Sequence, residues 1–165
     1  GGLDYEAQSG FYAGTWASNA DWSQGMTYEL DLYGGYGGEF NGIGFDLGFI
    51  SYLYPDSDED VDFTELNFGL SLGSFSISYA VLADAEGVDF GDDSYVAVDA
   101  SFGLISDITL AFHVGTGTDD FYAGESFVDY NFTLNKSGFT FGISKTDLST
   151  DDMKVFVSYA VDIDF

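Results

Sequence analysis

A two-residue hydrophobic alternation runs along almost the whole chain and constrains its fold more than any other feature. In segment 153–165, for example, Val155, Val157 and Tyr159 lie on one face, and Phe156 and Ser158 lie on the other. Successive side chains of a β-strand point to opposite sides, so this period is typical of strands with one apolar face and one polar face. Because no segment shows a convincing helical period, the sequence predicts an all-β fold.

The alternating segments predict about eleven strands, most of them around ten residues long. They span residues 3–7, 11–18, 26–36, 43–54, 62–72, 75–83, 94–104, 108–116, 126–134, 139–146 and 153–164. A tilted strand needs about this length to cross a bilayer, whereas strands of soluble proteins are typically about half as long. Short connections alternate with longer acidic ones, as in outer-membrane barrels with tight turns at one rim and long loops at the other. We therefore expect a single domain over 1–165, an up-and-down antiparallel transmembrane β-barrel.

The strand number leads to a further expectation. Single-chain bacterial barrels have even numbers of strands, so a count of about eleven is one short. We expect the complete barrel to have about twelve strands, with an additional N-terminal strand that 1–165 lacks.

Composition restricts the possible partners. The 165 residues include 29 acidic side chains but only 3 Lys or Arg, which gives a formal net charge of −26. This charge argues against a nucleic-acid partner, because almost no basic side chain is present to neutralise phosphates. An aromatic content of 19% argues against the disorder that usually accompanies such acidity. Without cysteine, the chain has neither a disulfide framework nor a thiolate metal site.

Alternation alone does not distinguish a membrane barrel from a soluble acidic β-sandwich, whose apolar face would form the core. Aromatic residues near strand ends, among them Trp16, Tyr28, Tyr54, Phe75 and Phe139, favour the barrel. In outer-membrane barrels such residues form girdles beside the lipid-facing band. The alternative is a soluble sandwich with a structural, adhesive or filament-forming role at the cell surface, where an open sheet edge would accept a neighbour's strand.

Three segments also carry a resemblance to a known family. The stretches FYAGTWASNADW at 11–22, YELDLYGGYGGEFNGIGFDLGFISYLYP at 28–55 and the terminal VSYAVDIDF resemble the TorF-type porin family of Gram-negative bacteria. The resemblance implies a β-barrel of the bacterial outer membrane with a channel role and no catalytic residues. Members of that family carry a further segment before the stretch that corresponds to residues 1–6, GGLDYE, in this chain.

In a barrel the polar face of each strand would line the lumen and the apolar face would meet lipid. The expected lumen-lining carboxylates are Glu29, Asp31, Asp46, Glu65, Asp99, Asp129, Asp162 and Asp164. The expected lipid-facing side chains are Leu30, Leu32, Phe112, Val155, Val157 and Tyr159. Carboxylates crowded in a narrow tube attract cations, so we expect a pore for small cationic or neutral solutes. A wet but plugged lumen is the alternative, because about twelve strands lie between the filled eight-stranded barrel and the open sixteen-stranded porin.

An acidic loop invites a calcium interpretation. Asp56, Asp58 and Asp60 fit three ligand positions of a calcium-binding loop, but Val61 stands where that loop requires Gly. Weak calcium binding by these carboxylates is therefore one interpretation, and a solvated loop is the simpler one. We expect no other metal site.

The single histidine could indicate an enzyme. Strand 108–116 places His113 on the polar face, where Asp99 or Asp129 could reach it and Ser101 is near in register. An isolated histidine on a wet face is commoner than a catalytic triad, so we expect no enzymatic activity and no cofactor. The expected partners are outer-membrane lipid and small solutes, and the sequence does not define an oligomeric state.

Overall fold

The structure, a computed structural model, describes residues 1–105, 107–118 and 124–163. All regular elements in these ranges are β-strands. They are β1 (Gly2–Glu6), β2 (Phe11–Asn19), β3 (Tyr28–Phe40), β4 (Ile43–Leu53), β5 (Phe63–Leu72), β6 (Phe75–Ala85), β7 (Ser94–Gly103), β8 (Thr109–Gly117), β9 (Phe127–Lys136), β10 (Phe139–Thr146) and β11 (Lys154–Tyr159). The described part of the chain has no helix that is long and apolar enough to cross a membrane.

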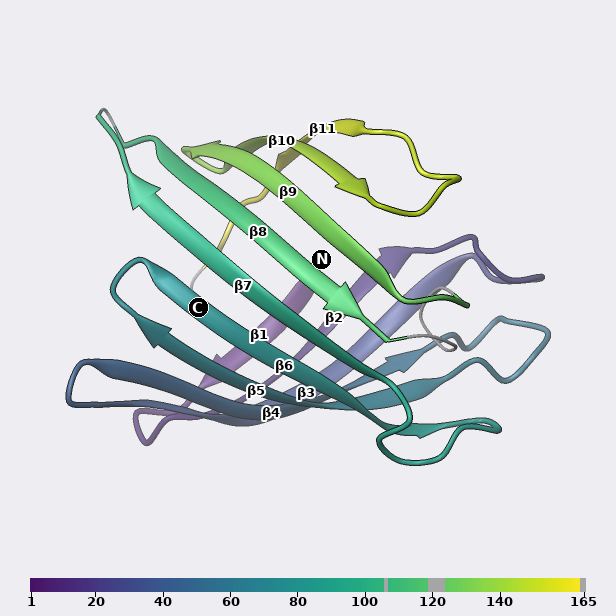
Figure 1. The fold of residues 1–165 in the computed structure, drawn as a ribbon. Helices are drawn as coiled ribbons and strands as arrows, with labels where there is room; N and C mark the ends of the chain where they lie inside the picture. Colours follow the sequence, from purple (N-terminus) through teal and green to yellow (C-terminus); the bar gives the residue numbers. More distant parts are fainter. Residues whose placement is uncertain (106, 119–123, 164–165) are drawn as a thin grey trace.

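The eleven strands form one continuous sheet in which each strand pairs with its neighbours in the sequence (Figure 1). Every pairing is antiparallel, as in the register Phe112↔Phe132 between β8 and β9. The predicted all-β, up-and-down antiparallel fold is thus confirmed. A sandwich of two packed sheets, the alternative architecture, is not what the strands form.

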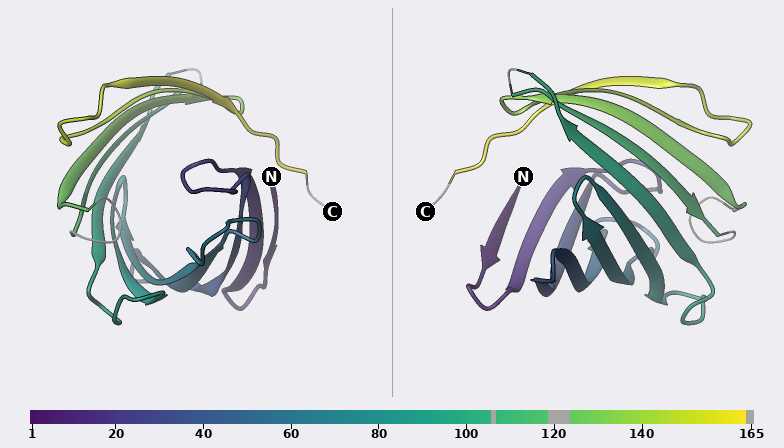
Figure 2. Two further views of the ribbon diagram at one scale, coloured as in Figure 1. Left: turned by 90° about the vertical axis from the view of Figure 1, so that its right-hand side faces the viewer. Right: turned by 60° about the vertical axis from the view of Figure 1, so that its left-hand side comes forward.

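The sheet curls almost into a ring but does not close (Figure 2). Its two edge strands, β1 and β11, pair only with β2 and β10 respectively. β1 and β11 run in the same direction, because each strand of the meander is antiparallel to the one before it and nine strands lie between these two. They therefore could not pair with each other in the antiparallel manner of the other strands.

The last strand ends earlier than predicted. The expected strand 153–164 is represented only by β11, which ends at Tyr159. Tyr159 pairs with Phe139, the first residue of β10, so later residues have no strand opposite them on that side. The alternation of the following sequence therefore does not extend the strand. Asp162 lies in the exposed segment beyond β11, and Asp164 lies outside the described residues.

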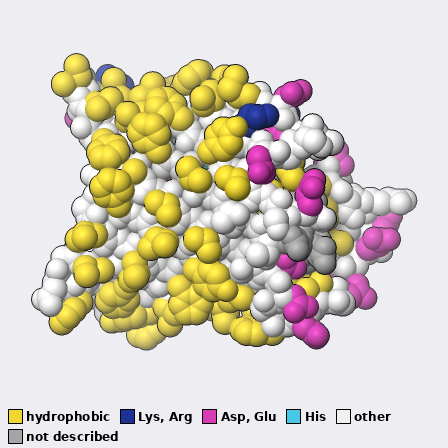
Figure 3. Space-filling model, viewed as in Figure 1, with side chains coloured by type: hydrophobic (Ala, Val, Ile, Leu, Met, Phe, Trp, Pro, Cys, Tyr) yellow, Lys and Arg dark blue, Asp and Glu magenta, His cyan; other side chains and the backbone are white. Residues whose placement is uncertain are grey.

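The convex face of the sheet is apolar. Large hydrophobic side chains project from it with much of their surface uncovered, including Phe112 at 43% exposure, Val98 at 50% and Val157 at 68%. Hydrophobic side chains spread over the outer wall of the strands in Figure 3, whereas Asp and Glu gather at the end that carries the longer loops. Apolar surface of this extent is more than a monomer in water usually exposes.

Tight turns build the opposite rim. β3 and β4 are joined by Asn41 and Gly42 alone, with φ of 52° and 80°. A two-residue hairpin loop with positive φ at both positions has the twist that flanking strands require, and Asn followed by Gly is its preferred sequence. The predicted alternation of short turns and longer loops is therefore present, and Figure 1 places the longer loops together at one end.

Candidate functional site

The concave face carries most of the predicted carboxylates. Glu29 and Asp31 lie on β3, Asp46 on β4 and Glu65 on β5, and Asp99 and Asp129 lie on β7 and β9. Each alternates with outward-facing neighbours along its strand, and all six point to the same side of the sheet. Of the remaining two predicted positions, Asp162 lies in the segment after β11 and Asp164 is outside the described residues.

Tyrosine hydroxyls from one or two strands away hold most of these carboxylates. Tyr12 donates to Asp46 at 2.9 Å and Tyr54 donates to Glu29 at 2.6 Å. The remaining pairs are Tyr95 to Asp129 at 2.7 Å, Tyr52 to Glu65 at 3.4 Å, and Tyr33 to Asp4. A hydrogen bond to a carboxylate is charge-assisted and stronger than a neutral one, so these pairs fix the acidic groups in place.

Glycines make room for the tyrosine rings on the concave face. An added Cβ at Gly115 would collide with the ring of Tyr95, and one at Gly35 would collide with the hydroxyl of Tyr12. The rings therefore lie over strand backbone that carries no side chain at these points. Because other residues there would clash, the small size of Gly35 and Gly115 is part of how the hydroxyls reach Asp46 and Asp129.

Asp31 is the exception among the carboxylates. Only 7% of the residue is exposed, yet its Oδ1 atom has no hydrogen-bond partner within the described part of the chain. Its neighbours in register are Trp16 on β2 and Tyr52 on β4. A buried carboxylate oxygen without a donor is energetically costly, which distinguishes Asp31 from the tyrosine-bound carboxylates.

His113 lies at the centre of a second cluster. Its Nδ1 is 2.7 Å from Oδ1 of Asp99, and its Nε2 is 3.0 Å from Oδ1 of Asp129 and 2.8 Å from the Tyr95 hydroxyl. Both ring nitrogens are therefore engaged, and neither is left to activate Ser101. This geometry differs from a catalytic triad, whose histidine keeps one nitrogen for the nucleophile.

Three concave-face carboxylates, Asp4, Glu6 and Glu39, were missed in the sequence analysis. Asp4 and Glu6 lie on β1 and alternate with Leu3 and Tyr5, which are 66% and 70% exposed. Glu39 lies near the end of β3 on the same side as Asp31. The alternation that located the other carboxylates was visible in both strands. The tyrosine partners were also missed, because cross-strand register decides which hydroxyl meets which acid.

The predicted lipid-facing residues lie on the convex face. Leu32 is 44% exposed, Val155 62% and Tyr159 61%, whereas Leu30 is half-buried between its strand neighbours. The expected aromatic girdle needs correction. Trp16 pairs in register with Asp31 and so lies on the concave side, and Tyr54 is buried at the long-loop rim.

The acidic loop between β4 and β5 uses its carboxylates internally. Oδ2 of Asp56 accepts hydrogen bonds from the backbone N and the hydroxyl of Thr27, and Oδ1 of Asp60 accepts one from the backbone N of Asp62. Within the described ranges no three His, Asp or Glu side chains form a group that could hold a metal ion. Asp56, Asp58 and Asp60 therefore do not converge into the calcium site considered above.

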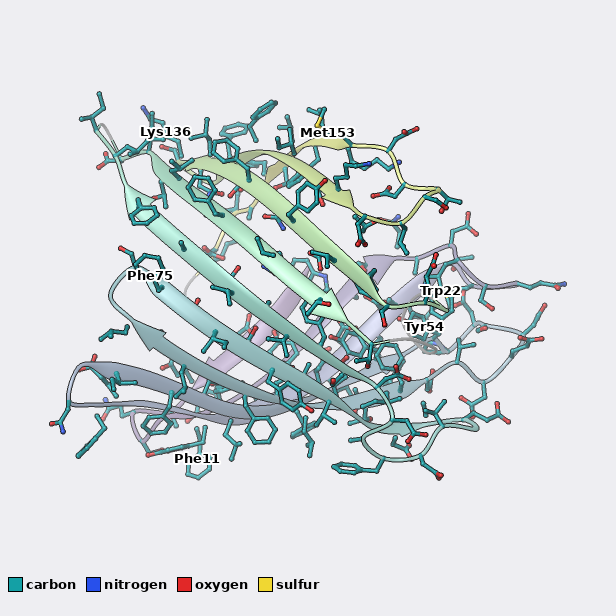
Figure 4. The ribbon with its side chains drawn as sticks, viewed as in Figure 1. Phe11, Trp22, Tyr54, Phe75, Lys136 and Met153 are labelled. Carbon is teal, nitrogen blue, oxygen red and sulfur yellow. The ribbon has the colours of Figure 1, made fainter. Side chains whose placement is uncertain are left out.

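The loops at this rim contact one another. Besides the Thr27 to Asp56 bonds, the backbone N of Asp58 donates to the carbonyl of Gln24 at 3.0 Å. Trp22 packs edge-on against Tyr54, with ring centres 5.0 Å apart, and Figure 4 shows the two side chains together at the loop end. The loops β2–β3 and β4–β5 thus form one connected structure at the mouth of the curved sheet.

The fold and the concave face define a class: a single curved meander with an apolar convex wall and tyrosine-bound carboxylates inside. The chain belongs to the family described as "Bacterial protein of unknown function (Gcw_chp)", whose family model matches residues 1–163. This finding corrects the resemblance stated above, because nothing indicates a TorF-type porin family. No curated protein matches the chain, and no solved structure matches it.

Proposed function

We propose that this chain is a β-barrel of the bacterial outer membrane that conducts small cationic or neutral solutes. The observation that carries the proposal is the contrast between the two faces of one sheet. The convex face exposes side chains such as Phe112 and Val98, and the concave face holds Asp46, Glu65 and Asp129. In water, exposing such an apolar face costs free energy, so a soluble protein would cover it. In lipid, an outward apolar face is favourable.

Strand length also supports a membrane location. Nine of the eleven strands have between 8 and 13 residues, the exceptions being the edge strands β1 with 5 and β11 with 6. A tilted transmembrane strand needs about 9–11 residues. The longer strands thus suit a hydrocarbon layer, and the acidic loops would remain in water at one rim.

Closure requires one further strand in this proposal. β1 and β11 run in the same direction, so an antiparallel barrel closes only if an additional strand runs the opposite way between them. Twelve strands would also give the even number found in single-chain bacterial barrels. The additional strand would satisfy the open backbone groups along both edges, which hydrocarbon does not tolerate.

The interior charge supports selectivity for cations. Nine carboxylates lie on the concave side of the described strands, namely the six predicted ones with Asp4, Glu6 and Glu39. The basic side chains on that side of the described strands are Lys154 and His113, whereas Lys136 and Lys145 lie on the convex side. Rings of carboxylates favour cations and disfavour anions in a water-filled pore. The tyrosine rings beside these acids narrow the lumen, so small solutes are the expected cargo.

Conductance across a planar bilayer tests the proposal. The full chain is purified in detergent and inserted into a bilayer that separates two potassium chloride concentrations. It should give ion currents whose reversal potential has the sign of the potassium equilibrium potential. Neutralising two interior acids in Glu65→Gln/Asp129→Asn should move that potential toward zero. Asp152→Asn in the exposed loop is the matched control and should leave it unchanged.

Two results would overturn the proposal. A chain that inserts without conducting, or that prefers chloride, is not a cation pore. A chain that elutes as a monodisperse species without detergent belongs instead to the class of soluble surface proteins, because an exposed apolar wall of this size would otherwise aggregate.

A further inference from the structure

Burial on the concave face changes along the length of the strands. In the half nearer the long loops, β3, β5 and β7 each carry a concave residue that is almost fully buried, namely Asp31, Glu65 and Ala97. In the half nearer the short turns, the same three strands carry exposed concave residues, namely Glu39, Ser71 and Ser101. The interior of this part of the sheet is therefore filled near the long loops and open near the short turns.

Aromatic rings occupy the filled half. Tyr52 stacks on Phe63 with ring centres 4.4 Å apart, and Tyr95 stacks on Phe127 at 6.3 Å. In the open half, the concave residues of β5 and β6 are small: Gly69, Ser71, Ser76 and Ser78. A ring adds more thickness to the inner wall than a serine side chain or a glycine does. The passage along the concave face is therefore narrower near the long loops than near the short turns.

The Tyr95 ring is held in one position. Its hydroxyl donates to Oδ2 of Asp129 at 2.7 Å and lies 2.8 Å from Nε2 of His113. The ring passes over Gly115, where an added Cβ would collide with it. Gly115 is itself buried and stands opposite Ala97 in register, so the ring lies beside the buried Ala97. A side chain fixed by packing and hydrogen bonds gives an opening of constant size.

We propose that the ring-lined half of the interior is the constriction of the pore, and that the Tyr95 ring sets the largest solute that passes it. The inference rests on the proposed function, because it assigns the place of selection within that pore. The Tyr95 hydroxyl is bound to Asp129, and Asp129 and Asp99 hold His113 between them. Size and charge are therefore selected at one place, which favours small cations over larger ones.

Conductance for two cations of different size tests the role of Tyr95. Potassium and tetramethylammonium are compared in the planar bilayer, and the ratio of the tetramethylammonium to the potassium conductance reports the size limit. Tyr95→Ala should raise this ratio about two- to fivefold, because pore diameter decides which cations pass. Tyr95→Phe keeps the ring and should raise it far less. Tyr79→Ala is the matched control, because it removes a tyrosine ring from the convex face of the adjoining strand β6, and it should leave the ratio unchanged.

Thiol labelling in detergent micelles tests the constriction without requiring any current. The chain has no cysteine, so one introduced cysteine is the only thiol. Ala97, at 2% exposure, and the exposed Ser101 lie on the concave side of the same strand, β7. Ala97→Cys should react with 2-aminoethyl methanethiosulfonate about tenfold more slowly than Ser101→Cys, because thiol modification follows exposure. Combining Ala97→Cys with Tyr95→Ala should recover most of that difference.

The inference is overturned if Tyr95→Ala changes the conductance ratio no more than Tyr95→Phe does, or if Ala97→Cys and Ser101→Cys react at the same rate. Failure of the constriction and failure of the pore are separable. A chain that carries no current, but whose thiol at position 97 reacts slowly until Tyr95→Ala is added, refutes conduction and leaves the constriction standing. A chain that conducts with the same ratio before and after Tyr95→Ala refutes the role of Tyr95 alone.

Discussion

Replacing Val98 with arginine tests which medium the convex face meets. Val98 lies in the middle of β7, is 50% exposed and faces the same side as its register partners Ile77 and Val114. An arginine at the mid-depth of a lipid-facing barrel wall costs about 2–4 kcal/mol of unfolding free energy. In water the same change removes only cross-strand apolar contacts, worth less than about 1 kcal/mol.

Urea unfolding of the chain in lipid vesicles measures this difference. Ser101→Arg is the matched control, because Ser101 is an exposed residue of the same strand that faces the concave side, near Asp99. We expect Val98→Arg to lower the unfolding free energy by about 2–4 kcal/mol and Ser101→Arg to change it by less than about 0.5 kcal/mol. A loss below about 1 kcal/mol for Val98→Arg, or equal losses for the two variants, would refute a lipid-facing wall.

Three further predictions concern the turns, the interior and the loops. Gly42→Ala should lower the unfolding free energy by about 1–2 kcal/mol, because φ at this position is 80° and the space around it is open, so that only backbone strain is added; an unchanged urea midpoint would contradict this. Tyr12→Phe leaves Asp46 without its donor and should cost about 1–3 kcal/mol in the same assay, while Tyr5→Phe on the exposed face of β1 should cost nothing measurable. Hydrogen bonds from Thr27 lower the pKa of Asp56, so this carboxylate stabilises the loops above its unfolded pKa of about 3.9 and the stabilisation is lost as the pH falls through the lower folded value. The urea midpoint should therefore fall more steeply below pH 4 in the unchanged chain than in Asp56→Asn, and parallel curves would count against the bond.

Alternation predicted the arrangement of the strands well, because each strand of a single curved sheet must separate its two faces. The turn at Asn41 and Gly42 and the side on which Asp99 and Asp129 lie both follow from local sequence. The end of β11 does not. The alternation continues past Tyr159, but the strand stops where β10 begins and hydrogen-bond partners run out.

The chemical character of the concave face was harder to predict. Tyr12 and Asp46 are 34 residues apart, and only the pairing of three strands brings them together. The burial of Asp31 is another property of the assembled sheet, since Trp16 and Tyr52 flank it from neighbouring strands. Composition identifies an acidic interior, but it cannot distinguish a carboxylate bound by tyrosine from one that lacks a donor.

The unequal ends of the sheet would give a membrane-inserted chain a single orientation. The hairpin connection at Asn41 and Gly42 carries no charge, whereas the loop over residues 54–62 carries five carboxylates. Translocation of that loop across the hydrocarbon layer would expose each carboxylate to a medium that cannot solvate it. The hairpin at Asn41 and Gly42 carries no such cost, so the two ends of the sheet would not be interchangeable in a membrane.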